Sequence, residues 1–276
     1  MRSRLVIKVL LMAALVLVLA ACAEPPPPTQ EEVAEEAAEI ADILSLSATA
    51  WQVVTLGGPG NELPLIEGST PTLNFFVERY AGFSGCNYYL AAYSIDGNSI
   101  SLLGPTQTIL QCAEPEGVME QEATFIGILQ NATEFDLEGE TLTLFTVGEQ
   151  PLATFTRAEN LPLEGTTWQL KFYVVDEEIT PIIEGSEVTA IFEGDAVSGS
   201  GGCNNYNGTV AVDGSNLTVS GVASTMMACN EPAGVMDQEA AFLSQLENAA
   251  SFELGGSTLI VANADNEPIM LFAVQE

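Results

Sequence analysis

The sequence predicts a mainly β (α+β) protein in which two small antiparallel β-barrel or sandwich-like domains follow one another, each with one amphipathic helix. Three observations support this fold class. The chain aligns with itself at an offset of 117 residues without a gap, so that Trp51 matches Trp168 and Phe155 matches Phe272. Each half consists of short β-branched or aromatic runs between turn signals. Each half also contains one segment with helical periodicity.

The first 22 residues have the pattern of a lipoprotein signal peptide. Arg2, Arg4 and Lys8 precede an unbroken apolar run that ends in Leu-Ala-Ala-Cys at Cys22. A charged start, an apolar centre and a small-residue cleavage site are typical of an export signal, here with a lipobox. The pattern predicts a lipid on Cys22. The alternatives are an ordinary secreted protein and an uncleaved anchor, although the apolar run is short for a membrane-spanning helix.

The leader therefore predicts an extracytoplasmic protein that meets the membrane through its N-terminal lipid. Ala23 follows the lipid-bearing cysteine and is not a retention signal of the aspartate kind. We expect the outer membrane in a host with two membranes, and the outer face of the cytoplasmic membrane otherwise. Residues 23–45 begin with a proline run and continue with closely spaced carboxylates, which favours an extended Pro/Glu-rich tether.

After the leader the chain is strongly acidic. Its remaining basic residues are Arg79, Arg157 and Lys171, against 38 carboxylates, so its formal net charge is −35. A surface of this sign repels nucleic acid and anionic lipid head groups, and it attracts cationic partners in a salt-dependent way. Solubility or a salty habitat explains the same charge without a dedicated partner. The charge thus argues against nucleic acid binding and identifies no partner.

The repeat divides the remaining chain into two domains, at residues 46–157 and 163–276, joined by a short charged linker that contains a proline. Turn signals such as Asp96-Gly97-Asn98 and Glu138-Gly139-Glu140 separate the strand-like runs of the first unit. These runs are WQVVTL, TLNFFVE, LAAYSI, SISLLG, TLTLF and LATF, and the second unit repeats them. Tight turns between neighbouring strands favour antiparallel pairing, and hence a barrel or a sandwich.

One segment in each unit predicts an amphipathic helix, at residues 117–131 and about 233–248. In the first of these, Val118, Phe125 and Leu129 recur at three- and four-residue spacing. A glutamate and a proline precede each segment, and both suit a helix N-terminus, where a missing N–H and a negative charge are favourable. We expect each helix to pack on its sheet or to close one end of it.

Four cysteines remain after Cys22, two in each unit. Cys86 and Cys112 are 26 residues apart, as are Cys203 and Cys229. Equal spacing in an exported protein predicts one disulfide inside each unit, and free or reactive thiols are the alternative. A zinc site is disfavoured because the chain has no histidine and each unit has two cysteines. The sequence contains no Cys-x-x-Cys pair, which is the spacing typical of redox-active cysteines. We expect no metal and no cofactor.

The residues around the second pair of cysteines carry a family resemblance. GCNNYNG (202–208), TMMACNEP (225–232), MDQEAAFLSQL (236–246) and LEGTTWQL (163–170) resemble the META domain of the heat-inducible HslJ lipoproteins. The resemblance covers 163–274 well and 46–157 more loosely, because Tyr88 stands where the second unit has Asn205 and ILQC replaces MMAC. The motif residues, to which we assign structural roles, are Gly85, Asn87, Gly202, Asn204, Asn205, Tyr206, Met226, Met227, Gln238 and Glu239.

The resemblance implies a compact antiparallel β-barrel-like fold with a helix, a location in the cell envelope, and links to stress tolerance that include resistance to some antibiotics. The resemblance implies no catalytic residue. The sequence also has no histidine, which is the commonest general base in enzymes. Glu122 and Glu239 lie near the apolar side of the predicted helices, where we expect them to accept hydrogen bonds from the glycine-cysteine-asparagine segment. For Met226 and Met227 we favour core packing over binding of a soft metal such as Cu(I).

Three hypotheses about function follow from these observations. The first is a non-enzymatic envelope lipoprotein that binds a protein or an envelope component under stress. The second is an acidic inhibitor of a basic exported hydrolase, steered by charge. The third is a carrier of a small apolar ligand, which needs a continuous apolar cavity inside the sheet. Interiors filled by Trp51, Phe75, Phe125 and their counterparts would exclude the carrier.

Overall fold

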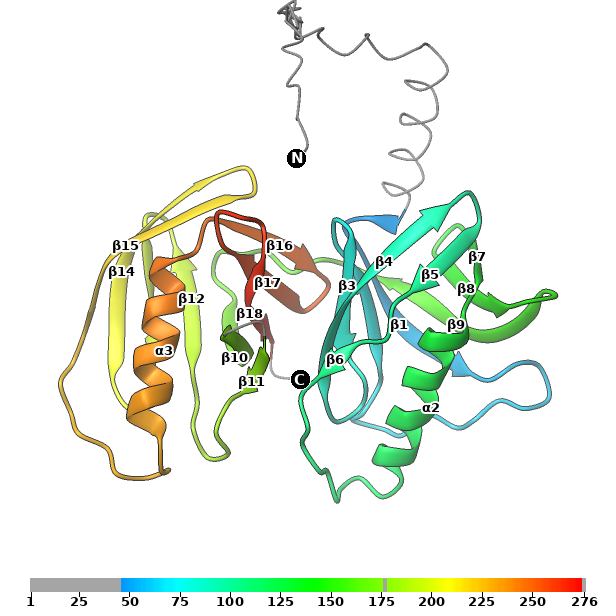
Figure 1. The fold of residues 1–276 in the computed structure, drawn as a ribbon, viewed down its shortest axis with the longest axis horizontal. Coiled ribbons are helices and arrows are strands. Elements are labelled where there is room, and N and C mark those ends of the chain that lie inside the picture. The colour runs from blue at the N-terminus through cyan, green and yellow to red at the C-terminus, as the bar shows by residue number, and fades with distance from the viewer. Residues whose placement is uncertain (1–45, 176–177, 275–276) are drawn as a thin grey trace, which may run out of the picture.

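Each repeated unit folds into an antiparallel β-barrel with one helix, and the two barrels lie side by side (Figure 1). The structure, a computed structural model, describes residues 46–175 and 178–274. The predicted fold class, two tandem mainly β units, is confirmed. The signal peptide, Cys22 and the tether at 23–45 lie outside the described residues.

The two barrels contain the same kinds of element in nearly the same order. The first consists of β1 (Thr49–Leu56), β2 (Thr72–Phe75), β3 (Arg79–Phe83), β4 (Tyr88–Asp96), β5 (Ser99–Leu102), β6 (Thr106–Gln107), α2 (Val118–Asn131), β7 (Glu134–Glu138), β8 (Thr141–Thr146) and β9 (Gln150–Ala158). The second consists of β10 (Thr167–Val175), β11 (Glu178–Pro181), β12 (Thr189–Glu193), β13 (Ala196–Ser200), β14 (Asn205–Asp213), β15 (Asn216–Ser224), α3 (Val235–Glu247), β16 (Ser251–Gly255), β17 (Thr258–Ala262) and β18 (Pro268–Ala273).

Each sheet closes on itself. The first sheet runs β3-β2-β1-β9-β8-β7-β5-β4, and β3 also pairs with β4. The second runs β10-β12-β13-β14-β15-β16-β17-β18, and β10 also pairs with β18. One short strand is added to each ring, β6 beside β4 and β11 beside β10. Closure removes the exposed edges that an open sheet presents for aggregation.

The two helices begin and end close to where the periodicity predicts. Each follows a glycine, Gly117 or Gly234, with a φ of 87°. This is the left-handed region of backbone space, which glycine enters without a steric cost. Within residues 46–175 and 178–274, neither helix is long and apolar enough to cross a membrane.

Aromatic side chains fill the interior of each barrel. Phe125 of α2 packs between Tyr89 and Phe155, with ring centroids 5.9 and 6.5 Å away. Phe242 of α3 packs against Tyr206 and Phe272 in the same way, at 5.4 and 6.4 Å. Trp51, Phe75 and their counterparts Trp168 and Phe192 are also buried. The carrier hypothesis, which needs an apolar cavity in this space, is therefore wrong.

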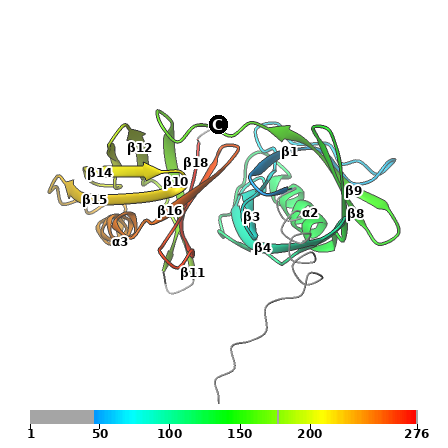
Figure 2. The same ribbon diagram turned by 90° about the horizontal axis from the view of Figure 1, so that it is seen from above.

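A third apolar cluster joins the two barrels. Phe76 and Ala81 of the first unit are buried together with Phe172, Ile260 and Leu271 of the second. Figure 2 shows the barrels from above, with β16 and β18 on the side of the second barrel that faces the first. Burial of large apolar side chains on both sides stabilises a fixed arrangement of the two units.

Candidate functional site

The family motif forms a buried hydrogen-bond network in both units. In the second unit, Glu239 accepts hydrogen bonds from the backbone N–H groups of Cys203 and Asn204, at 3.2 and 2.6 Å, and from Nδ2 of Asn204 at 2.8 Å. Glu122 accepts the equivalent bonds from Cys86 and Asn87, at 3.3, 2.8 and 2.8 Å. These are the donors that the sequence predicts for the two carboxylates.

The asparagine in each network also holds the segment that leads to the second cysteine. Oδ1 of Asn204 accepts from the N–H of Met227 at 2.7 Å and from the hydroxyl of Thr225 at 2.8 Å, while its Nδ2 also donates to the carbonyl of Met227 at 3.2 Å. Asn87 makes the same contacts with Leu110 and Thr108. The side chain of one asparagine thus fastens two distant loops in each unit.

The predicted disulfides are both present and join the same two loops. Cys86 bonds to Cys112 and Cys203 bonds to Cys229, each with a separation of 26 residues. The glycines before the first cysteine, Gly85 and Gly202, have φ values of 121° and 111°, which favour glycine over any other residue. Disulfides persist in oxidising compartments, so both indicate an extracytoplasmic location.

Gln238 and Tyr206 of the motif form hydrogen bonds with neighbouring segments of the same barrel. Gln238 accepts from the N–H of Ile183 at 2.7 Å and donates to the Ser186 hydroxyl at 2.5 Å. The Tyr206 hydroxyl donates to the carbonyl of Thr189 at 2.9 Å, and burial of this ring raises the pKa of Tyr206. Asn205 is exposed at the start of β14.

The expectation of core packing for Met226 and Met227 is wrong. Their side chains are 98% and 57% exposed, and the matching Ile109 and Leu110 of the first unit are exposed as well. The reason is that Asn204 and the disulfide hold the backbone of this loop, so the apolar side chains need not pack to keep it in place. Apolar character in this loop therefore did not indicate burial.

The network offers little scope for acid–base chemistry. The carboxylates of Glu122 and Glu239 are buried and already accept hydrogen bonds from the protein. Among residues 46–175 and 178–274, no three His, Cys, Asp or Glu side chains lie together so as to hold a metal ion. The glutamate–asparagine network therefore fastens the cysteine-bearing loop to the helix in each unit.

A groove between the two barrels is the other candidate site. It has a volume of about 900 Å³. Its apolar lining includes Leu90 of β4, Val174 of β10, Ile179 of β11 and Ile269 of β18. Its polar lining comes from Arg79, Thr106, Gln245, Asn248, Asn263, Asp265 and Glu267. Neither unit could form this groove alone, because both contribute to its walls.

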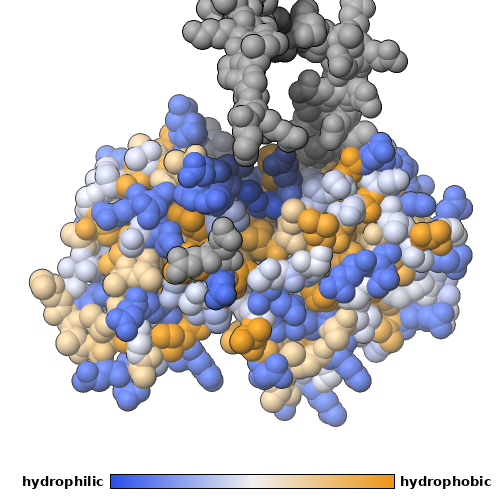
Figure 3. All heavy atoms as spheres, in the orientation of Figure 1, coloured by the Kyte–Doolittle hydropathy of each residue, from blue (hydrophilic) through white to orange (hydrophobic). Residues whose placement is uncertain are grey.

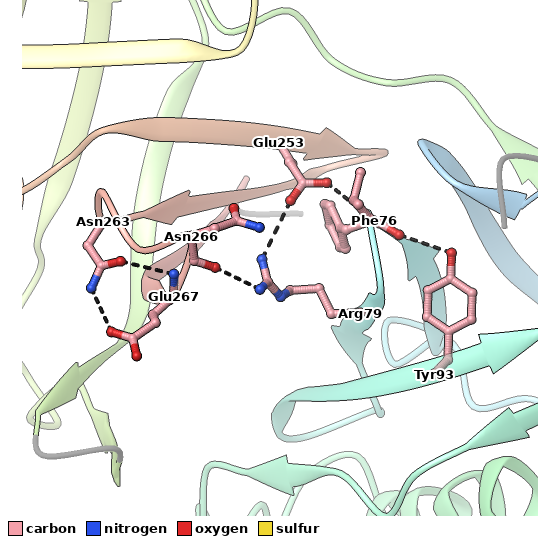
Figure 4. Close-up of polar contacts among 8 residues, drawn as sticks. Phe76, Arg79, Tyr93, Glu253, Asn263, Asn266 and Glu267 are labelled. Atoms are coloured by element: carbon pink, nitrogen blue, oxygen red, sulfur yellow. Dashed lines mark hydrogen bonds and ion pairs between the residues drawn. The ribbon is translucent and has the colours of Figure 1, made fainter. Parts of the chain in front are cut away.

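Arg79 anchors the groove across the junction of the barrels. Its Nη2 donates to the carbonyl of Asn266 at 2.7 Å, and its Nη1 lies 3.7 Å from Oε1 of Glu253 (Figure 4). The other carboxylate oxygen of Glu253 accepts from the N–H of Val77 at 2.8 Å. The side chain of Asn263 stabilises the turn that contains Asn266 by accepting a hydrogen bond from the N–H of Glu267 at 2.9 Å. A cation of the first unit is thereby paired with two residues of the second.

The second unit also contributes a cation to the junction, because Lys171 contacts a residue of the first unit. Its Nζ lies 5.2 Å from the centre of the Tyr88 ring, an arrangement typical of a cation–π interaction. Burial lowers the pKa of Lys171, and the negative charge of Glu187 opposes that shift. Two of the three basic residues that follow the leader therefore lie at the junction. On the face drawn in Figure 3, hydrophilic and hydrophobic residues are interspersed over both barrels.

The sequence prediction missed the groove and the junction completely. One signal was available in the comparison of the two units, because Phe76 matches Glu193 and Leu271 matches Thr154 at the repeat offset. An exchange of a large apolar residue for a polar one between copies indicates a surface that is buried in one copy and exposed in the other. The alignment shows the exchange but not which surfaces meet.

Comparison with known proteins identifies the domain. The META domain family matches residues 44–159 and 161–276, and no curated protein matches the chain. A protein from Burkholderia xenovorans solved by NMR is 20% identical, over 50% of this chain and 94% of its own, with a TM-score of 0.37. A DUF4847 family protein from Bacteroides vulgatus is 15% identical, over 40% of this chain and 93% of its own, with a TM-score of 0.30. The matches to the family cover both barrels, and the chain belongs to the META domain family, with two META domains in tandem.

Proposed function

We propose that the protein is a membrane-anchored extracytoplasmic lipoprotein that binds a protein or an envelope component in the groove between its META domains. The groove carries this proposal. Its volume of about 900 Å³ is in the range of ligand-binding clefts, and it lies at a domain junction with apolar walls and a few polar groups. We further propose that binding contributes to stress tolerance, as the family resemblance implies.

A binding role without catalysis agrees with the chemistry available. The chain has no histidine, and the two buried glutamates of the motif are occupied by hydrogen bonds. The groove contains a guanidinium, amides and carboxylates around an apolar floor, which suits recognition of an amphipathic surface. Arg79 is already paired with Glu253 and Asn266, so its role is to hold the two walls of the groove together.

Site-specific photocrosslinking in the native host tests the groove. Ala92 lines the groove and is exposed, whereas Val147 is exposed in a turn and does not line it. A photoreactive residue at Ala92 is expected to give a discrete adduct during heat stress that the same residue at Val147 does not give. Ala92→Trp, which adds bulk to the groove, should weaken heat tolerance as much as deletion of the gene does. Equal adducts from both positions would contradict the proposal.

The lipid anchor needs its own test, because Cys22 lies outside the described residues. Metabolic labelling with a clickable fatty acid should label the wild-type protein and not Cys22→Ser. The variant should also move from the membrane fraction to the soluble exported fraction. Retention of both label and membrane association in Cys22→Ser would show that the anchor is something else.

A second candidate function is inhibition of a basic exported hydrolase. The formal charge of −35 on the chain after the leader favours it, since a surface of one sign speeds the approach of a partner of the other sign. Retention of a basic protein on the immobilised chain from Ala23 onward, with release at high salt and loss of hydrolase activity in the complex, would support this function. Retention of no basic protein at any ionic strength would exclude it.

A further inference from the structure

The junction between the two META domains uses a different face of each domain. The first domain contributes Phe76, just after β2, and Ala81 of β3. The second contributes a row of three neighbours, because Phe172 of β10 pairs with Leu271 of β18, which pairs with Ile260 of β17. An interface between non-equivalent faces is heterologous, and copies joined in this way extend into an open chain unless something stops them.

Each face has a counterpart on the other domain that is not buried in the junction. At the repeat offset, Phe172, Leu271 and Ile260 match Thr55, Thr154 and Thr143 of the first domain. These three threonines form the same cross-strand row, since Thr55 pairs with Thr154 and Thr154 with Thr143. The hydroxyls of Thr55 and Thr154 are hydrogen-bonded to each other at 2.6 Å. The first domain therefore presents a polar row where the second presents an apolar one.

The free face of the second domain is also more polar than the equivalent face of the first domain. Phe76 and Ala81 match Glu193 and Ser198 of the second domain, and both of these are exposed. A buried phenylalanine is thus replaced by a carboxylate at the free end. A glutamate pressed against an apolar row would lose its hydration without gaining a partner, which is unfavourable.

The two cations of the junction also lack counterparts on the free faces. Arg79 matches Ala196, and Lys171 matches Val54. The free faces therefore lack both cations that connect the domains. Gly255, where a side chain would come within 2.8 Å of the Phe76 ring, matches Glu138 in the first domain. Close approach at this point is possible in one copy and blocked in the other.

We propose that the polar residues on the two free faces of the tandem pair prevent further META domains from adding to it. The faces that meet are built to recognise another META domain. Thr55, Thr143 and Thr154 cap the free face at one end, and Glu193 with Ser198 caps it at the other. The partner that the apolar row fits is a META domain with a large apolar residue at the position of Phe76. The polar caps limit this recognition to the two domains of one chain.

Removing the caps tests the proposal in the protein from Ala23 onward. A row variant carries Thr55→Phe, Glu138→Gly, Thr143→Ile and Thr154→Leu, the residues of the second domain. An edge variant carries Glu193→Phe and Ser198→Ala, the residues of the first. A combined variant carries all six changes. The matched control places an equal amount of apolar surface on the outer face of β14 and β15, through Thr209→Ile, Thr218→Leu and Ser220→Phe, all at exposed positions.

Sedimentation velocity across a wide concentration range is the measurement, with circular dichroism as the test of folding. We expect the wild type, the row variant and the edge variant to be monomers when alone. An equimolar mixture of the row and edge variants should double in mass, and the combined variant should form long, concentration-dependent polymers. The control should remain a monomer, alone and in a mixture with the edge variant.

Three results would overturn the proposal. One is a wild type that already forms chains, because the caps would then not terminate anything. Another is a folded combined variant that stays monomeric, because the faces would then not recognise a META domain. The third is association of the control with the edge variant as strong as that of the row variant, because general apolar adhesion would then explain the result.

Discussion

Nδ2 of Asn204 donates to Oε1 of Glu239 over 2.8 Å, and Asn87 makes the same contact with Glu122 at the same distance in the other domain. Both residues of each pair are buried. Through this contact, the carboxylate on the helix fixes the asparagine that in turn fixes the loop before the second cysteine. The sequence motif is therefore explained by one chain of hydrogen bonds, from the helix glutamate to the asparagine and from the asparagine to the loop, which is present in both domains.

Glu239→Ala should lower the free energy of unfolding of the second domain by about 3 kcal/mol, because two backbone donors and an amide lose their charged acceptor. Glu239→Gln should lower it less, because one acceptor oxygen remains. Urea unfolding followed by Trp168 fluorescence, in a background with Trp51→Phe, measures the effect. Glu247→Ala, at an exposed position of the same helix, is the control and should change little. Equal midpoints for all variants would contradict the role of the network.

Gly255→Ala should loosen the junction between the domains. An added Cβ would lie 2.8 Å from the Phe76 ring and 2.9 Å from Cβ of Asn74, closer than packed atoms approach. Lys171 is the only lysine after residue 8, so acetylation of its side chain reports how open the junction is. We expect faster acetylation of Lys171 in this variant.

Gly127→Ala is the matched control for the junction, because a Cβ at Gly127 meets nothing within 4 Å. It should leave the acetylation rate unchanged and, as an alanine within a helix, stabilise α2 by up to about 1 kcal/mol. If Gly255→Ala leaves Lys171 as slow to react as in the wild type, the junction is not as tight as its contacts indicate.

High pH should unfold the protein through its buried tyrosines. Burial raises the pKa of Tyr80, Tyr89, Tyr93, Tyr173 and Tyr206 above the ordinary value of 10.0. For Tyr93 burial and the nearby charges of Glu253 and Glu78 raise the pKa to about 12. A group whose pKa is raised by folding contributes stability that is complete below its unfolded pKa and is lost as the pH rises through the folded one. Stability should therefore fall above pH 10.0.

Ultraviolet absorbance of tyrosinate, recorded together with circular dichroism, measures this effect. Most of the tyrosinate signal should appear in the same step as the loss of β structure. Gradual ionisation of all the tyrosines near pH 10.0, with the fold intact, would show that these rings are not buried as described.

Of the methionines in residues 46–175 and 178–274, Met226 and Met227 should react first with dilute peroxide, because they are the most exposed of that set. Met270 is fully buried in the second core and should react last. Peptide mass spectrometry over time gives the order. Since the backbone of the loop is held by Asn204 and the disulfide, oxidation of the exposed pair should leave the unfolding midpoint unchanged. Protection of Met226 equal to that of Met270 would restore the core-packing interpretation.

Much of the fold within one domain is readable from local sequence. The apolar residues of α2 and α3 recur with helical spacing, so their buried side follows from the pattern alone. The pairing of Cys86 with Cys112 and of Cys203 with Cys229 follows from duplication, because two equal spacings have one simple explanation. The position of Glu122 and Glu239 on the helix likewise places them next to the loops that they bind.

By itself, the sequence determined the duplication, the mainly β class, the two helices and the two disulfides, because each depends on spacing along the chain. The tertiary structure alone decided that Met226 and Met227 face solvent, that Phe76 is buried against Phe172, and that a groove opens between the barrels. The last two features depend on which surfaces of the two domains meet, and Phe76 and Phe172 are more than 90 residues apart in the sequence. An apolar residue has the same pattern whether it is buried in its own barrel, buried against the neighbouring one or left exposed, and only the packing of the closed barrels distinguishes the three.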